Sequence, residues 1–238
     1  MHAPPHLDAR DRLIFPYWDI NQRSILYIQG RSLTQDNKIR WLAQKNSAIA
    51  TTLFNQPALN DNDHYLLICE GASDTLTLID LGLSAVGTAS LDIDLKKYVE
   101  YFRNRDLIFI YDTDKHAVNS HDLPISWSKI LPKLKDLVEK GIRCYCYKVR
   151  HCKDINEYVL QYGKEKLRRS IVTYKLPLEE FILGSGYKED FVIETSISII
   201  STSRLFRYRL DKLIRYHYGN LINILLVNTN KMSNRNKE

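Results

Sequence analysis

The sequence predicts an α/β fold, in which a mostly parallel sheet is flanked by helices. Three runs, Tyr65–Cys69, Leu107–Tyr111 and Arg143–Val149, have the composition of buried strands. The segments between them carry apolar residues at helical spacing. A regular alternation of strand and helix is typical of parallel sheets covered on their faces.

The first half of this pattern has clear boundary signals. The strand Tyr65–Cys69 stops at Glu70-Gly71, and Ser73 can cap a helix that runs to about Leu81. Gly82 stands where a left-handed residue often ends a helix. We expect a short strand at Ala85–Val86 and an amphipathic helix over residues 92–104.

The second half repeats the alternation. After the strand Leu107–Tyr111, a helical face is formed by Ile130, Leu131, Leu134, Leu137 and Val138. Pro132 is expected only in the first turn of this helix, because proline lacks the donor that later turns need. Gly141 ends the helix, and Arg143–Val149 and residues 155–162 follow as a strand and a short helix.

The two ends of the chain differ from this central part. Residues 12–54 contain short β-like runs such as Ser24–Ile28, and the Pro- and Asn-rich segment Gln56–Asp63 reads as a connector. From Lys164 onward the periodicity weakens until a basic amphipathic helix begins near Arg204. The predicted domains are therefore a small N-terminal α+β subdomain (1–60), a central α/β domain (61–165) and a basic helical C-terminal extension (166–238).

Composition and charge narrow the classes of function. The 238 residues are 44% apolar with a net charge of +6, which excludes a wholly disordered chain. No apolar run approaches the roughly 20 residues of a membrane span, and Met1–Arg12 has no signal-peptide core. With four cysteines, we expect a soluble cytoplasmic protein without disulfides and without a membrane partner. Residues 204–238 hold eight Lys and Arg against two Asp and Glu, a balance that favours a polyanion such as nucleic acid.

Acidic side chains follow three of the predicted strands. Glu70 comes directly after the first, Asp112 and Asp114 after the second, and Asp154 after the third. Ligands of open α/β sheets bind at the carboxyl ends of the strands, so these acids should converge. Carboxylates in that number bind hard cations such as Mg²⁺, and a neighbouring glutamate can transfer protons. Nucleotidyl transfer and phosphodiester hydrolysis need such sites.

These residues also carry a family resemblance. The segments Leu66–Leu76, Gly82–Thr88 and Leu107–Lys115 together resemble the TOPRIM fold, most closely the catalytic core of bacterial-type (DnaG-like) DNA primases and their phage and plasmid relatives. Lys153-Asp154-Ile155-Asn156-Glu157 is similar to the Lys-Asp-Pro-Asp-Glu stretch of those primases. Upstream, Phe15-Pro16, Gly30-Arg31 and Lys38-Ile39 are similar to the segment that precedes their TOPRIM module.

The resemblance implies roles for individual residues. Glu70 would be the general acid or base, and Asp112 and Asp114 would bind Mg²⁺ or Mn²⁺, with Asp74 and Asp154 in the acidic rim. Contacts to nucleic acid or nucleotide are expected from Arg31, Lys38, Lys115, Lys153, Arg207 and Arg215. The family's zinc-binding module and a helicase P-loop are absent from this sequence, so a replicative helicase or a separate template-recognition module is an expected partner.

The implied activity is synthesis of short RNA primers from ribonucleoside triphosphates on single-stranded DNA, in the cytoplasm at the nucleoid. Two alternatives remain open: another TOPRIM enzyme such as a nuclease, or a non-catalytic DNA-binding module of a mobile-element replication apparatus. Asn156 replaces the family's second acid, Lys115-His116 replaces Lys-Ala-Gly, and Gln22-Arg23 stands where the upstream turn often has glycine.

A zinc site is not expected. Cys144, Cys146, His151 and Cys152 cluster in sequence, but Cys144 and Cys146 are two residues apart on a predicted strand and lack the spacing of a zinc knuckle. Buried structural thiols fit this pattern better.

Overall fold

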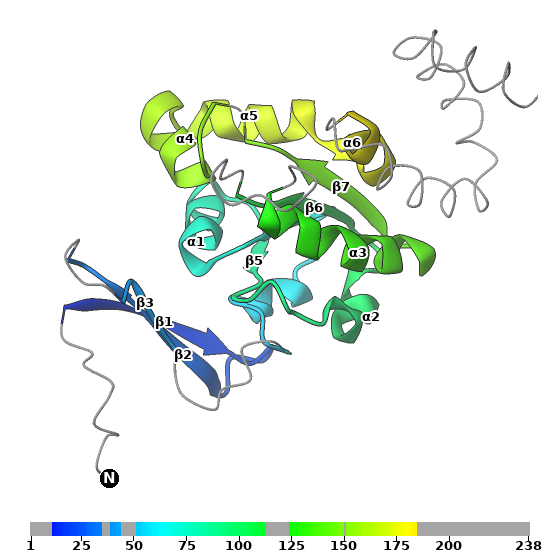
Figure 1. Ribbon diagram of the computed structural model, residues 1–238. Helices are drawn as coiled ribbons and strands as arrows, with labels where there is room; N and C mark the ends of the chain where they lie inside the picture. The colour runs from blue at the N-terminus through cyan, green and yellow to red at the C-terminus, as the bar shows by residue number, and fades with distance from the viewer. Residues whose placement is uncertain (1–10, 35–38, 44–50, 113–123, 150, 185–238) are drawn as a thin grey trace, which may run out of the picture. The chain divides into compact units, whose positions relative to one another are not determined.

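The computed structural model describes residues 11–34, 39–43, 51–112, 124–149 and 151–184. Its centre is a five-stranded sheet with the strand order β5-β4-β6-β7-β8 (Figure 1). Strands β4 (Tyr65–Cys69), β5 (Ala85–Gly87), β6 (Asp106–Ile110) and β7 (Arg143–Tyr147) run parallel, and β8 (Leu176–Pro177) pairs antiparallel with β7. The predicted α/β class is therefore confirmed.

Helices cover both faces of this sheet. On one face, α1 (Ala72–Asp80), α4 (Ile155–Tyr162) and α5 (Lys164–Tyr174) pack against the odd-numbered positions of β4 and the even-numbered positions of β6, such as Leu67 and Ile108. The alternate positions of both strands are equally buried and point to the other face, where α3 (Ile125–Glu139) lies. Burial on both faces explains why these strands are apolar throughout rather than alternating.

The packed unit continues beyond residue 165, where the sequence places a boundary. Leu167 and Ile171 of α5 are buried in the core. β8 adds an antiparallel edge to the sheet, and α6 (Leu178–Gly184) packs on α3 through Phe181 and Trp127, whose ring centroids are 4.5 Å apart. The predicted basic helix beginning near Arg204 lies outside the described residues.

Two predicted helices differ from the structure. The helix expected over 92–104 is a 3₁₀ turn, η3 (Leu95–Tyr98), followed by the short α2 (Val99–Phe102). Asp94 caps η3 by accepting the backbone N–H of Lys96. α3 begins at Ile125, so Pro132 stands in its middle and not in its first turn. The buried face of α3, which includes Trp127 and Leu134, outweighs the loss of one backbone hydrogen bond.

The start of α1 also corrects the prediction. Gly71, not Ser73, is its N-cap, so Ser73 lies within the first turn. At the other end, Gly82 adopts a φ of +71°, as expected for a residue that ends a helix in the left-handed conformation.

The N-terminal part forms a separate antiparallel sheet of β1 (Arg12–Trp18), β2 (Ile25–Ser32) and β3 (Trp41–Ala43). Its inner face, with Phe15, Tyr17 and Tyr27, packs against Phe54 and against Ala72 of α1. The turn between β1 and β2 places Gln22 at a φ of +57°, a conformation that glycine adopts at lower cost. A 3₁₀ helix, η2 (Gln56–Asn60), leads from this region into β4.

No helix in the described ranges is long and apolar enough to span a lipid bilayer.

Candidate active site

A cleft of about 490 Å³ opens at the carboxyl edge of the central sheet. Its walls come from the turns that follow β4 and β6, from the first turns of α1 and α4, and from β2 and β3. The lining residues are Gln29, Arg31, Arg40, Trp41, Glu70, Gly71, Ser73, Asp74, Ala89, Asp112, Lys153, Asp154 and Asn156. Acids that are far apart in the sequence thus share one cavity.

Glu70 follows the central strand β4 directly, and one of its carboxylate oxygens is out of contact with solvent. This atom, Oε2, has no hydrogen-bond donor among the described residues. A buried carboxylate oxygen without a partner is costly, and such atoms occur where a ligand, an ion or a transferred proton completes the site.

Close packing fixes the turn that carries Glu70. Thr75 donates its hydroxyl to the carbonyl of Gly71 at 2.8 Å, and Thr88 donates to the carbonyl of Glu70 at 3.4 Å. Gly87, at the end of β5, faces this turn so closely that a Cβ atom would lie 2.5 Å from the Thr75 hydroxyl. A glycine is needed at position 87 because the strand end and the helix start touch there.

Asp74 lies in the first turn of α1 and is almost completely buried at the floor of the cleft. Asn156 of α4 donates its amide to Asp74 Oδ1, and its own carbonyl oxygen accepts from the hydroxyl of Thr77. The amide that replaces an acid of the family pattern thus serves as a hydrogen-bond donor to a neighbouring acid. A carboxylate at position 156 would repel Asp74 instead.

This arrangement disfavours the ionised form of the Asp74 carboxyl group. Its burial, together with the negative charges of Asp112, Asp154 and Glu70, raises the pKa of Asp74 to about 8, while Arg31 acts in the opposite direction. Burial and the neighbouring carboxylates therefore favour the protonated form of Asp74.

Asp154 caps the helix α4 in addition to lining the cleft. As N-cap of α4, its side chain accepts the backbone N–H of Glu157 at 2.8 Å, and Glu157 in turn accepts the backbone N–H of Lys153 at 2.7 Å. This is a close variant of the capping box. The Lys-Asp-x-Asn-Glu pattern thus also encodes the start of a helix.

The opposite wall is basic and aromatic. Arg31 of β2 stands directly across from Trp41 of β3, and its guanidinium carbon lies 5.4 Å from the centre of the indole ring. The side chain of Arg12 crosses Gly30 and donates to the carbonyl of Ile39 at 3.1 Å. Gly30 thus leaves room for the side chain that joins β1 to the start of β3.

The structure brings together six of the predicted site residues, namely Glu70, Asp74, Asp112, Asp154, Arg31 and Lys153. Five others, Asp114, Lys38, Lys115, Arg207 and Arg215, lie outside the described residues. Sequence reasoning missed Gln29, Arg40 and Trp41, whose place in the cleft depends on the pairing of β2 with β3. The one signal in the sequence was their closeness to Gly30-Arg31 and Lys38.

Within the described ranges, no three Asp, Glu, His or Cys side chains are close enough together to enclose a metal ion. The donor chemistry nevertheless fits a hard cation, because the cleft offers several carboxylate oxygens, and the buried Oε2 of Glu70 has no donor among the described residues. Cys144 and Cys146 lie buried in β7 as free thiols, and burial raises the pKa of each.

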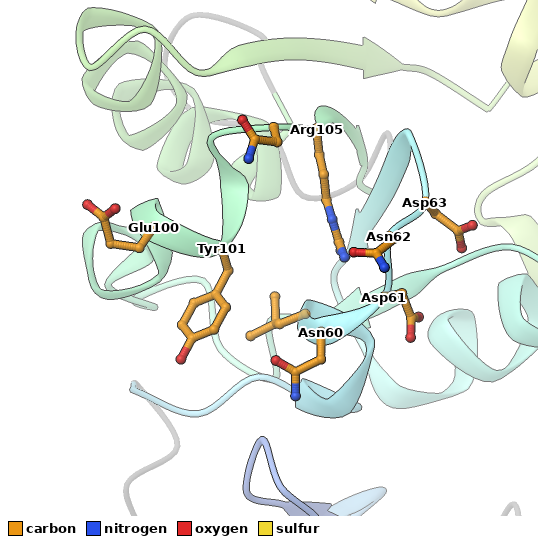
Figure 2. A pocket seen from close by; sticks show the side chains of 9 residues that line it. Asn60, Asp61, Asn62, Asp63, Glu100, Tyr101 and Arg105 are labelled. Atoms are coloured by element: carbon orange, nitrogen blue, oxygen red, sulfur yellow. The ribbon is translucent and has the colours of Figure 1, made fainter.

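A second hollow, of about 260 Å³, lies at the amino ends of β4 and β6 (Figure 2). Arg105 is buried there and donates to the carbonyl of Ala58 at 2.9 Å. Asp61 accepts from the hydroxyl of Ser84 at 3.0 Å. These bonds join η2 to the sheet, and we interpret this hollow as structural.

Taken together, the fold and the cleft define a class of protein: an α/β domain whose carboxyl edge presents clustered acids to a basic, aromatic wall. Comparison with known proteins shows which of them share this fold. No family model and no curated protein matches the sequence. Solved structures do match, and catalytic cores of the primase DnaG are among them.

The RNA polymerase domain of Mycobacterium tuberculosis primase DnaG aligns over 85% of this chain and 69% of its own, with a TM-score of 0.66 and 16% identity. A DnaG catalytic core aligns over 88% of this chain and 70% of its own, with a TM-score of 0.62 and 20% identity. A DnaG catalytic domain bound to single-stranded DNA aligns over 74% of this chain and 56% of its own, with a TM-score of 0.54 and 23% identity. The chain therefore has the fold of DnaG catalytic cores, as the sequence predicted.

Proposed function

We propose that this chain is a primase-like nucleotidyltransferase, which joins ribonucleoside triphosphates into short RNA primers on a single-stranded DNA template. The observation that carries the proposal is the cleft in which Glu70, Asp74, Asp112 and Asp154 face Arg31. The DnaG fold supports it, because one neighbour is bound to single-stranded DNA and another is in complex with double-stranded DNA that has a 6-nucleotide overhang.

The residues of the cleft would have different roles in the reaction. Glu70 would accept the proton of the attacking hydroxyl; the buried Oε2, which has no donor among the described residues, supports this role. Arg31 and Lys153 line the same cavity and would bind phosphates, together with Lys38 and Lys115.

A divalent cation, Mg²⁺ or Mn²⁺, would be held by Asp112 and Asp114, with Asp74 and Asp154 in the rim. When bound, it would neutralise the charge on the reacting oxygens. Asn156 would hold Asp74 in place through its amide, as it does in the structure.

Template recognition would be shared with other elements. Arg207 and Arg215 of the basic C-terminal extension would contact the DNA backbone. A helicase or a separate template-recognition module would act as partner at the nucleoid.

A primer-synthesis assay tests the proposal. The purified chain is incubated with single-stranded DNA, labelled ribonucleotides and Mg²⁺, and the expected products are short oligoribonucleotides. Glu70→Gln and Asp112→Asn should each lower the rate by about 100-fold or more, because each removes a group that the reaction requires. Asp80→Asn is the matched control, since Asp80 is an exposed acid of α1 whose contact is an ion pair with Lys164.

Other outcomes would replace the proposal. Cleavage of the labelled DNA that depends on Glu70 and Asp112 would identify a nuclease. Binding of DNA with no synthesis and no cleavage, under Mg²⁺ or Mn²⁺, would identify a non-catalytic DNA-binding module.

A further inference from the structure

Trp41 is a feature of the cleft that the proposed chemistry leaves unused. Its side chain is 38% exposed, although it lines a cavity that is otherwise dominated by charged and polar groups. It does not belong to the buried aromatic cluster of the N-terminal sheet, which consists of Phe15, Tyr17 and Tyr27 with Phe54 and Ala72. An exposed indole inside a polar cleft is a surface that a bound ligand can cover.

The indole is held in a fixed orientation. Arg31, its direct partner across the strands, places its guanidinium carbon 5.4 Å from the ring centre. The ring of Phe15 lies 5.6 Å away at an angle of 45° and supports Trp41 from within the sheet. Such a flat, cationic and pre-oriented pair has the properties of a stacking surface for aromatic ligands.

The ligand must combine an aromatic ring with phosphates. The cleft that contains Trp41 is also lined by Arg31, Arg40 and Lys153, whose positive charges suit phosphates. Its volume of about 490 Å³ falls in the range of pockets for single small molecules. A nucleoside triphosphate has both parts, and a nucleobase of any identity presents a face that can stack.

We propose that Trp41, held in place by Arg31, forms the platform on which the base of the incoming nucleoside triphosphate stacks. This inference rests on the proposed function, because it assigns the base a place opposite the acids that would handle the triphosphate. Stacking of this kind is tolerant of sequence, so the platform would bind all four ribonucleotides with similar strength.

The chain offers a direct spectroscopic test, because it has only three tryptophans. Trp127 is completely buried, and Trp18 is 38% exposed on β1 but does not line the cleft. In a Trp18→Phe background, ATP should quench the fluorescence of Trp41, whereas inorganic triphosphate, which lacks the base, should not.

Substitutions then measure the contribution of the ring. By calorimetry, Trp41→Ala should weaken ATP binding by about 10-fold, the order expected for loss of one stacked base, and leave binding of inorganic triphosphate unchanged. Trp41→Phe should recover part of the loss, because it restores an aromatic face. Trp18→Ala is the matched control, since it removes an equally exposed indole from the same sheet, and it should bind ATP like the unchanged chain.

Three results would overturn the inference. The first is equal affinity of the Trp41→Ala variant and the unchanged chain for ATP. The second is an equal loss of affinity for ATP and for inorganic triphosphate, which would mean a general distortion of the cleft. The third is quenching by a short oligodeoxynucleotide but not by ATP, which would make Trp41 a contact for the template.

The same binding measurements, repeated in a Glu70→Gln background, separate this inference from the proposed function. If ATP binding there depends on Trp41 while the unchanged chain makes no primers, the proposed activity fails and the stacking site stands. If primers are made but Trp41→Ala changes neither binding nor KM, the stacking site fails and the activity stands.

Discussion

Asp74 combines three features of the cleft: burial, a hydrogen bond from a neighbouring element, and nearby negative charges. It is buried, it accepts a hydrogen bond from Asn156, and burial with neighbouring negative charges raises its pKa to about 8. A folded protein that keeps a carboxyl protonated up to that pH loses stability as the pH rises from about 4 to about 8, because only the unfolded chain can release the proton freely. Bound Mg²⁺ would remove this cost by replacing the proton.

The Asp74→Asn variant should therefore be more stable than the unchanged chain in the absence of divalent cations, and increasingly so at higher pH. We expect the two Tm values to agree near pH 4–5 and to differ by about 4 °C or more at pH 9, where about 1 kcal/mol corresponds to 2–4 °C. Thermal unfolding followed by circular dichroism across this pH range checks the prediction, with Asp80→Asn as the control. A difference in Tm that does not change with pH would contradict it.

At the scale of secondary-structure elements, the site depends on how closely α1 approaches the end of β5. Gly87 has no side chain, and an added Cβ would lie 2.5 Å from the Thr75 hydroxyl and 3.0 Å from the carbonyl oxygen of Gly71. The second of these atoms belongs to the backbone, which carries Glu70 and cannot rotate away.

Gly87→Ala should therefore destabilise the protein by about 1–3 kcal/mol, the usual cost of overpacking, and should lower primer synthesis by displacing Glu70. Gly71→Ala is the contrasting variant, because its added methyl group meets no atom closer than 3.8 Å. Urea unfolding of both variants gives the comparison. Equal stabilities would show that the contact at Gly87 does not constrain the turn.

Some elements could be predicted from the sequence nearly to the residue, and others could not. β4 at Tyr65–Cys69 and α4 at Ile155–Tyr162 match the prediction because apolar runs, turn residues and a capping aspartate all agree there. α3 begins earlier than predicted, because the burial of its apolar face overrides the local preference of Pro132.

In the candidate site, too, some features could be predicted from the sequence and others could not. Its acids follow strand ends in the chain, so their convergence could be inferred once the sheet was assumed to be parallel. The contact of Arg31 with Trp41 and the bond between Asn156 and Asp74 depend on tertiary pairing. No local pattern in the sequence encodes either contact.

For the molecule as a whole, the distribution of charge predicts how DNA is bound. Residues 1–203 are balanced, so the net charge of +6 equals that of residues 204–238, where Arg207 and Arg215 lie. Each phosphate contact to single-stranded DNA contributes about 0.7 to the slope of log affinity against log salt concentration.

Reversing the charge of both residues, as Arg207→Glu with Arg215→Glu, should weaken binding of single-stranded DNA and flatten the salt slope by about 1.4. Fluorescence anisotropy over a range of salt concentrations measures both quantities. Lys96→Glu with Arg103→Glu makes the same change in net charge, in η3 and at the end of α2. Neither residue lines the cleft, so the slope should stay as it is in the unchanged chain. A slope left unaltered by the Arg207 and Arg215 changes would move the proposed DNA path to Arg31 and Lys38.

The strand order β5-β4-β6-β7 has a consequence for how the protein is made. The cleft needs β2 and β3 from the beginning of the chain and Asn156 from well beyond its middle, and Asn156 bonds to a residue 82 positions earlier. During translation, β4 is exposed to solvent on an unpaired edge until β6 has been synthesised. Asp74 therefore remains apart from Asn156 on the ribosome, and a nascent chain can complete the cleft only after α4 has emerged from the exit tunnel.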